Sequence, residues 1–484
     1  MIRRLALLAA FVFAAEARTS AFQEPESGGG GSSDSEGAKK ADEKAEKVED
    51  RWYAVVGGEV HTGTGAVLRG ATVLAKNGKI TAIGNNVDIP PEAKRLDAAG
   101  MHVYPGIVAI SSQGLVGTAG SDFEDTIDPF NSRMILGLSS GITTSGVAGT
   151  AVKLRRFSVK DPVVREKFFT ILSWSDRNPA GKRTLRDKFQ KAAEYLRQYR
   201  DWEEKVKKDK ELKEPAKKDV DSSVLSVLKN ESLAKFTAND RDEILGVARL
   251  AQEFGFRPVV EGCMEGWTVA DELGRAGAFA ILTPRDRRAK DEQSVAEGGA
   301  SIQNAGILYR AGVQVAVTPA SESVDLGGLV GRDIVAIAIE ADFAVRGGLP
   351  EEAALAAITT VPARIMGISH RVGSLEVGKD CDLIVADGDL LHYKTFVQYT
   401  VVDGKLAYDK EKELFFAHIR PRPVVAPPEK KLDKGETKAA PAEPKEDDKA
   451  KAGDKEEKKD EPKKEEKKDD KKDGDKKDGD RLRL

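Results

Sequence analysis

Cysteine, histidine and long apolar runs are scarce in this chain of 484 residues. Its two cysteines, Cys263 and Cys381, exclude a disulfide framework. Each lies in an apolar stretch, so buried thiols are favoured over a single bridge. The apolar run at residues 5–15 is too short to span a membrane. With 77 basic and 80 acidic residues the net charge is −3, which indicates neither a nucleic-acid partner nor an anionic lipid surface.

Both ends of the chain differ from its middle. Residues 1–21 combine Arg3 and Arg4, the apolar run that follows them and small residues suited to cleavage, which is the pattern of a signal peptide. This pattern predicts export to the periplasm or the extracellular space. Residues 22–51 and 426–484 have few large apolar side chains, so we expect a disordered linker and a disordered tail rich in Lys, Asp and Glu.

The middle of the chain is organised in three parts. Residues 52–104 and 369–425 contain short strands, with turn signals at Asn77-Gly78 and Asp403-Gly404. Residues 105–368 alternate short apolar strands with amphipathic helices, which indicates parallel β/α architecture. Residues 182–230 form a charged insertion within that part, with a helix expected from Leu185 to Glu214.

Three phrases carry a family resemblance. Pro105-Gly106 opens an apolar strand, residues 350–364 have the composition of a buried helix, and residues 371–389 lead into the final strands. Together they resemble the amidohydrolase superfamily over about residues 53–410, and within it the imidazolonepropionase-like group of metal-dependent hydrolases. The resemblance implies an α/β fold: a (β/α)8 TIM barrel with a composite β-sandwich formed from both flanks.

The same resemblance implies a chemistry. Members of the superfamily hydrolyse non-peptide C–N bonds in amides or cyclic amides, with one or two divalent metals such as Zn at the carboxyl ends of the barrel strands. The bound ion lowers the pKa of a water molecule, and an Asp on the eighth strand accepts its proton.

The ligand positions of that chemistry hold other residues here. Ser111 and Gln113 stand where the first strand has His-x-His. Thr237 and Gly262 stand where the fifth and sixth strands have histidines, and Ala320 replaces the general base. Neutral hydroxyl and amide groups are poor ligands for zinc. The sequence therefore predicts no bound metal, no cofactor and no catalytic residue.

The remaining histidines and carboxylates offer little replacement. We interpret the histidines as structural or surface residues of the β-sandwich portions, with only His102 near a barrel entrance. Four carboxylates at the presumed mouth could bind calcium or magnesium or share acid–base work, although helix caps and salt bridges explain most such residues. The five histidines are His61, His102, His370, His392 and His418, and the four carboxylates are Asp240, Asp242, Glu261 and Glu265.

We interpret two motifs of other enzyme classes as chance matches. Gly137-Leu-Ser-Ser-Gly141 fits the serine-hydrolase pattern, but the expected order of helix and strand around it is reversed. Cys263 lacks a histidine placed to activate it.

The first functional hypothesis is a degenerate, non-catalytic amidohydrolase that binds a ligand or a partner. That partner would be an intact amidohydrolase relative or a second copy of the chain. The alternatives are an active amidohydrolase with an atypical site, and an envelope structural module tethered by the charged tail.

Overall fold

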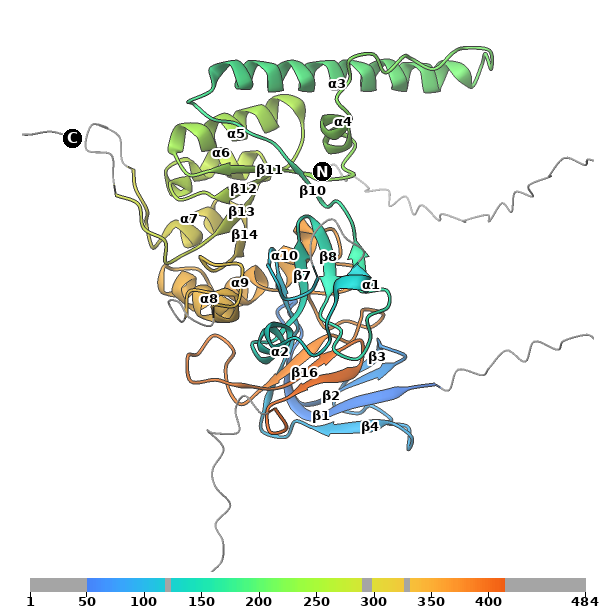
Figure 1. The fold of residues 1–484 in the computed structure, drawn as a ribbon, viewed down its shortest axis with the longest axis vertical. Helices are drawn as coiled ribbons and strands as arrows, with labels where there is room; N and C mark the ends of the chain where they lie inside the picture. Colours follow the sequence, from blue (N-terminus) through green and yellow to red (C-terminus); the bar gives the residue numbers. More distant parts are fainter. Residues whose placement is uncertain (1–49, 118–122, 290–297, 326–330, 414–484) are drawn as a thin grey trace, which may run out of the picture. The chain divides into compact units, whose positions relative to one another are not determined.

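The computed structural model describes residues 50–117, 123–289, 298–325 and 331–413. The expected signal peptide, nearly all of the linker, the charged tail and His418 lie outside the described residues. Within the described ranges, no helix combines the length and the apolar composition needed to cross a bilayer. The strands of these ranges form three sheets (Figure 1).

The largest sheet draws its eight strands from both flanks of the chain: β1 (Trp52–His61), β2 (Val67–Lys76), β3 (Lys79–Gly84), β4 (Lys94–Asp97), β5 (His102–Pro105), β15 (Leu383–Ala386), β16 (Val397–Val402) and β17 (Lys405–Asp409). Its order is β17-β16-β15-β5-β1-β2-β3, with β4 beside β1. Antiparallel pairing of β5 with β15 joins the two flanks, with Val103 opposite Val385. The chain thus leaves this sheet after β5 and returns to it at β15.

Both predicted hairpin turns are confirmed. Asn77 and Gly78 join β2 to β3 with φ values of 51° and 85°. Asp403 and Gly404 join β16 to β17 with φ values of 49° and 63°. Two successive residues with positive φ are what a tight two-residue hairpin requires, which explains the Asn-Gly and Asp-Gly pairs.

The middle of the chain supplies two smaller sheets. One has four strands, β6 (Ile107–Ala109), β7 (Ile142–Val147), β8 (Thr150–Lys153) and β9 (Val163–Arg165). The other has five parallel strands, β10 (Phe169–Ile171), β11 (Leu233–Ala238), β12 (Pro258–Gly262), β13 (Phe279–Leu282) and β14 (Gln314–Val317). The two sheets share an apolar cluster that includes Val108, Val259, Ile281 and Ala316.

Not all of the eight strands expected to be parallel are parallel in the sheets of the described residues. β6 and β7 are parallel, but β8 and β9 each run antiparallel to the strand before them. The cause is a tight turn at Ala148-Gly149, where φ values of 47° and 85° reverse the chain after β7. A parallel bridge between Gln113 and Ser323 brings the segment after β6 beside the segment after β14. The fold is therefore mixed α/β, and the ladders do not by themselves close an eight-stranded barrel.

Helices pack against the parallel strands (Figure 1). α5 contacts β11 and β12 through the apolar face that contains Ile244, Val247 and Leu250, and α7 contacts β14. The helices outside the insertion are α1 (Phe123–Thr126), α2 (Ser132–Ser139), α5 (Arg241–Phe254), α6 (Ala270–Arg275), α7 (Asn304–Arg310), α8 (Ile337–Arg346), α9 (Glu351–Ala357) and α10 (Thr360–Ile365), with 3-10 turns at Gly266–Val269 and Ile334–Ala336.

The charged insertion contains α3 (Pro179–Val206) and α4 (Ser222–Leu228). α3 packs on α5 by aromatic stacking, since the Phe189 ring lies 5.3 Å from that of Phe254 and 4.8 Å from that of Phe256. This confirms the expected packed helix. It ends at Val206 rather than at Glu214, because the lysines and acids that follow have almost no apolar side chain to bury.

A buried lysine connects the middle of the chain to its C-terminal return. Lys153 on β8 is fully buried, and its ammonium group lies 2.7 Å from a carboxylate oxygen of Asp380 and 3.0 Å from one of Asp382. It also pairs with Asp403, which accepts a 2.7 Å bond from Arg155. Burial alone would lower the pKa of Lys153, but the three carboxylates outweigh it and raise this pKa.

We predict that Lys153→Met lowers the free energy of unfolding by about 3–5 kcal/mol, because it leaves the buried Asp382 carboxylate without its cation. Urea titration measures the change. Lys160→Met is the matched control, since Lys160 is exposed and its replacement should change stability by less than about 0.5 kcal/mol. Equal midpoints for the two variants would show that the buried network does not stabilise the fold.

Candidate functional site

The carboxyl ends of β11 and β12 bring two of the predicted ligand positions together. In the parallel ladder Thr237 lies opposite Glu261, and Ala238 lies opposite Gly262. Parallel strands present their carboxyl ends at one edge, which is where related barrels hold their reacting groups. The side chains at this edge decide what it can bind.

An ion pair occupies the edge between these two strands. The ammonium group of Lys235 lies 2.8 Å from one carboxylate oxygen of Glu261, and the Thr237 hydroxyl donates to the other oxygen at 3.1 Å. Lys235 also lies over the Phe169 ring at 5.3 Å. Both oxygens of Glu261 are thus engaged by its neighbours in the ladder.

Sequence reasoning missed Lys235. A signal was available, because strand alternation places Leu233, Lys235 and Thr237 on one face of β11. Their neighbours Ala234, Phe236 and Ala238 are buried against the helices on the other face. The partner of Lys235 could not be read from the sequence, because the register with β12 is set by packing.

Gly262 cannot be exchanged for a ligand-bearing residue without local rearrangement. Its φ of +84° is strained for any residue with a side chain. A Cβ atom at this position would lie 2.2 Å from the Asn239 side-chain oxygen. The space that an imidazole would occupy is filled by Asn239.

The positions after β6 and β14 also meet. The Gln113 backbone N–H donates to the Glu322 carbonyl at 2.9 Å, and its side-chain amide donates to the Glu322 carboxylate at 3.2 Å. Ser111 is half-buried, and Ala320 is exposed and carries no group that could accept a proton. The segments that follow β6 and β14 are thus neighbours, and an amide–carboxylate contact joins them.

The four carboxylates of the presumed mouth have separate partners. Glu265 accepts the Arg241 backbone N–H at 2.9 Å and the Gly299 backbone N–H at 2.7 Å. Asp240 pairs with Arg288, and Asp242 lies 3.3 Å from the Arg241 side chain. Glu261 is paired with Lys235, as described above. Among the described residues these carboxylates form no group of three potential ligands within 4.8 Å.

The two motifs of other enzyme classes have the predicted surroundings. Residues 137–141 run from the end of α2 toward β7, so helix precedes strand, which is the reverse of a nucleophile elbow. Cys263 is fully buried, and burial raises its pKa to about 12, so its thiol stays protonated at neutral pH. Both cysteines are free and buried.

A cavity of about 610 Å³ opens beside the carboxyl end of β13. Arg285 donates to Glu340 at 2.8 Å, Arg332 pairs with Asp286, and Arg287 is exposed without an ion pair to a described residue. An Arg-rich segment directly after a strand was visible in the sequence and was not used. The cavity is lined by Pro284, Arg285, Asp286, Arg287, Arg288, Ala300, Ser301, Ile302, Arg332 and Phe343.

Comparison with known proteins agrees with this arrangement. Residues 268–408 match the model of the amidohydrolase family. The chain is thus similar to amidohydrolases over this part of its sequence. It is similar in fold to the crystal structure of an amidohydrolase from Thermotoga maritima, with 23% identity and a TM-score of 0.56 over 74% of this chain and 100% of that one.

The curated relatives of this chain match over short stretches. Amidohydrolase tasK of Hapsidospora irregularis is 34% identical over 84 residues, which are 17% of this chain and 9% of that protein. N-acetylglucosamine-6-phosphate deacetylase of Danio rerio is 46% identical over 55 residues, which are 11% of this chain and 14% of that protein. The matches thus span a small part of each relative.

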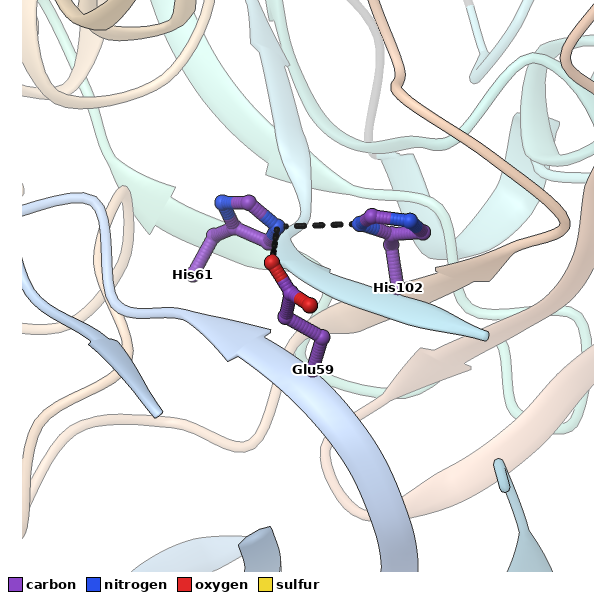
Figure 2. A group of neighbouring side chains, drawn as sticks. All are labelled: Glu59, His61 and His102. Carbon is purple, nitrogen blue, oxygen red and sulfur yellow. Dashed lines mark hydrogen bonds and ion pairs between the residues drawn. The ribbon is translucent and has the colours of Figure 1, made fainter. Parts of the chain in front are cut away.

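Two histidines of this chain converge away from the strand ends. Figure 2 shows Glu59, His61 and His102 facing one another, with both dashed contacts ending on the same nitrogen of His61. They are the one group of potential metal ligands within 4.8 Å of one another among the described residues. His370 and His392 are exposed.

We predict that Glu265→Ala lowers the free energy of unfolding by about 1.5–3 kcal/mol, because two backbone N–H groups lose a charged acceptor. Asp242→Ala is the control, since this carboxylate is 71% exposed and should contribute less than about 0.5 kcal/mol. Chemical denaturation of both variants measures the difference. If Glu265→Ala keeps the wild-type free energy of unfolding, these two bonds do not stabilise the fold, and Glu265 is instead a candidate functional carboxylate.

Proposed function

We propose that the protein is a degenerate, non-catalytic amidohydrolase that acts by binding a ligand or a partner. The observation that supports this most directly is Gly262, where the backbone conformation and the Asn239 side chain leave no space for a metal-binding side chain. The divalent metal of the superfamily does not fit the residues present at these strand ends, so we derive no step through it.

The neighbouring positions support the same proposal. Thr237 and Lys235 engage the Glu261 carboxylate, and Gln113 engages Glu322. Ala320 offers no general base. A single lost ligand can be compensated by another residue or by water. Hydrolysis in this protein would have to proceed in a site where every metal ligand and the general base of the superfamily are replaced. We propose that the scaffold is a (β/α)8 barrel with a composite β domain.

The arginine-lined cavity suggests the chemical class of the ligand. Arg285, Arg287, Arg288 and Arg332 line it, and guanidinium groups bind carboxylates and phosphates through paired hydrogen bonds. The Arg287 guanidinium is not consumed by an ion pair to a described residue. We infer that an anionic small molecule, with a phosphate or a carboxylate, binds beside the end of β13.

If the protein binds another protein, we propose that this partner is an intact amidohydrolase relative or a second copy of the chain. We propose that this encounter takes place outside the cytoplasm, as the N-terminal sequence pattern predicts. The following measurements distinguish this proposal from two alternatives. One is an active enzyme with an atypical site, and the other is an envelope structural module.

We predict no metal-dependent hydrolysis. The full chain, incubated in turn with zinc, manganese and iron, should not hydrolyse a cyclic amide or N-acetylglucosamine 6-phosphate faster than the same metal in buffer. The second probe is an amide with a phosphate, taken from the name of one relative. Turnover that appears with metal and is lost in Glu261→Gln would overturn the proposal, because it would place an active site at the end of β12.

We also predict phosphate binding at the arginine-lined cavity. Calorimetric titration with inorganic phosphate or N-acetylglucosamine 6-phosphate should show a single site, and Arg287→Ala should weaken its affinity at least ~10-fold because one charge-assisted contact is lost. Arg183→Ala is the matched control, since Arg183 is an exposed arginine on α3. Equal affinities in both variants would exclude this cavity as the ligand site.

A further inference from the structure

We propose that Glu59, His61 and His102 form a binding site for a divalent transition-metal ion of the zinc class. This site lies in the eight-stranded sheet and does not depend on the proposed function. The ion would be held by two imidazoles and one carboxylate, with the fourth position left to water or to an external ligand.

Sheet register brings the three residues together. β1 and β5 pair in parallel, with Glu59 opposite His102 and Val60 opposite Val103. His61 follows Glu59 by two residues, so strand alternation places both side chains on the same face of β1. A backbone bond of 2.9 Å from the Glu59 N–H to the Met101 carbonyl fixes this register.

The distances match a zinc site. His61 Nε2 lies 3.1 Å from His102 Nδ1 and 3.9 Å from Glu59 Oε1. Zinc–nitrogen bonds of about 2.0–2.1 Å in a tetrahedral site place two ligand nitrogens roughly 3.3 Å apart. The three donor atoms lie within 4.8 Å of one another, so an ion fits between them after small side-chain adjustments.

The rings are held in place by aromatic stacking. The Tyr104 ring lies 4.2 Å from that of His61 with an interplanar angle of 16°. Tyr104 follows His102 by two residues and so lies on the same face of β5. Because these rings are ordered before an ion arrives, binding would cost little side-chain entropy.

The charge of the cluster also suits a cation. Glu59 has one further cationic neighbour, Arg69, at 3.5 Å. Arg69 is 86% exposed, so its pairing with Glu59 is weak and a metal ion can displace it.

The consequence for the fold is a cross-link between two strands. β1 begins the described part of the chain, and β5 pairs with β15 from the opposite flank. An ion shared by β1 and β5 would tie the first strand to the point where the two flanks meet. We therefore expect metal to stabilise the fold by binding the native state and not the unfolded chain.

Zinc titration of the tag-free full chain, in excess magnesium, tests the proposal. We expect one zinc equivalent per chain and a zinc-dependent rise in Tm. His61→Ala and His102→Gln should each weaken zinc affinity at least ~100-fold and remove the rise in Tm. His370→Ala, at an exposed histidine, and Glu261→Gln, at the end of β12, are matched controls that should keep both.

Cobalt supplies a second readout, since four-coordinate Co²⁺ bound by nitrogen and oxygen ligands absorbs visible light much more strongly than hydrated, six-coordinate Co²⁺. Absence of zinc binding in the folded wild-type chain would overturn the proposal. So would binding that survives loss of both histidines. Binding lost only in Glu261→Gln would overturn it as well, and would also count against the non-catalytic function proposed above.

Discussion

The buried ammonium group of Lys153 is the constraint on which much of the structure depends. A fully buried cation is tolerated only with paired anions, and here they come from Asp380, Asp382 and Asp403, more than 220 residues further along the chain. This network requires β8 to lie beside the loops of the flank sheet. It therefore ties the strand–helix region to the sheet built from both ends of the described chain.

The same network lies next to the departure from eight parallel strands. The turn at Ala148-Gly149 reverses the chain, so β8 runs back along β7 and ends at Lys153. Asp403 is at once the first residue of the β16–β17 turn and an acceptor for Lys153 and Arg155. One set of charges thus links the β7–β8 hairpin to the tight turn between β16 and β17.

The proposed metal site and the strand ends that hold metal in the superfamily are separate in this molecule. The strand ends hold groups that satisfy one another, with Lys235 and Thr237 on Glu261, and Asn239 beside Gly262. The cluster with the geometry of a metal site lies on β1 and β5 instead. Metal found in this protein would therefore not by itself indicate hydrolysis, and the location of the ion would carry the functional information.

The sequence by itself indicated the resemblance to the amidohydrolase superfamily and both hairpin turns, and it predicted the loss of imidazoles at the strand ends, because these depend on local residue types in short phrases. Only the tertiary structure decided which side chains meet. Lys153 with its carboxylates, His61 with His102, and Lys235 with Glu261 each depend on strand register or on contacts between distant segments. Register is set by the packing of whole faces, which one strand's sequence does not specify. For the same reason the histidines appeared unremarkable until β1 and β5 were seen side by side.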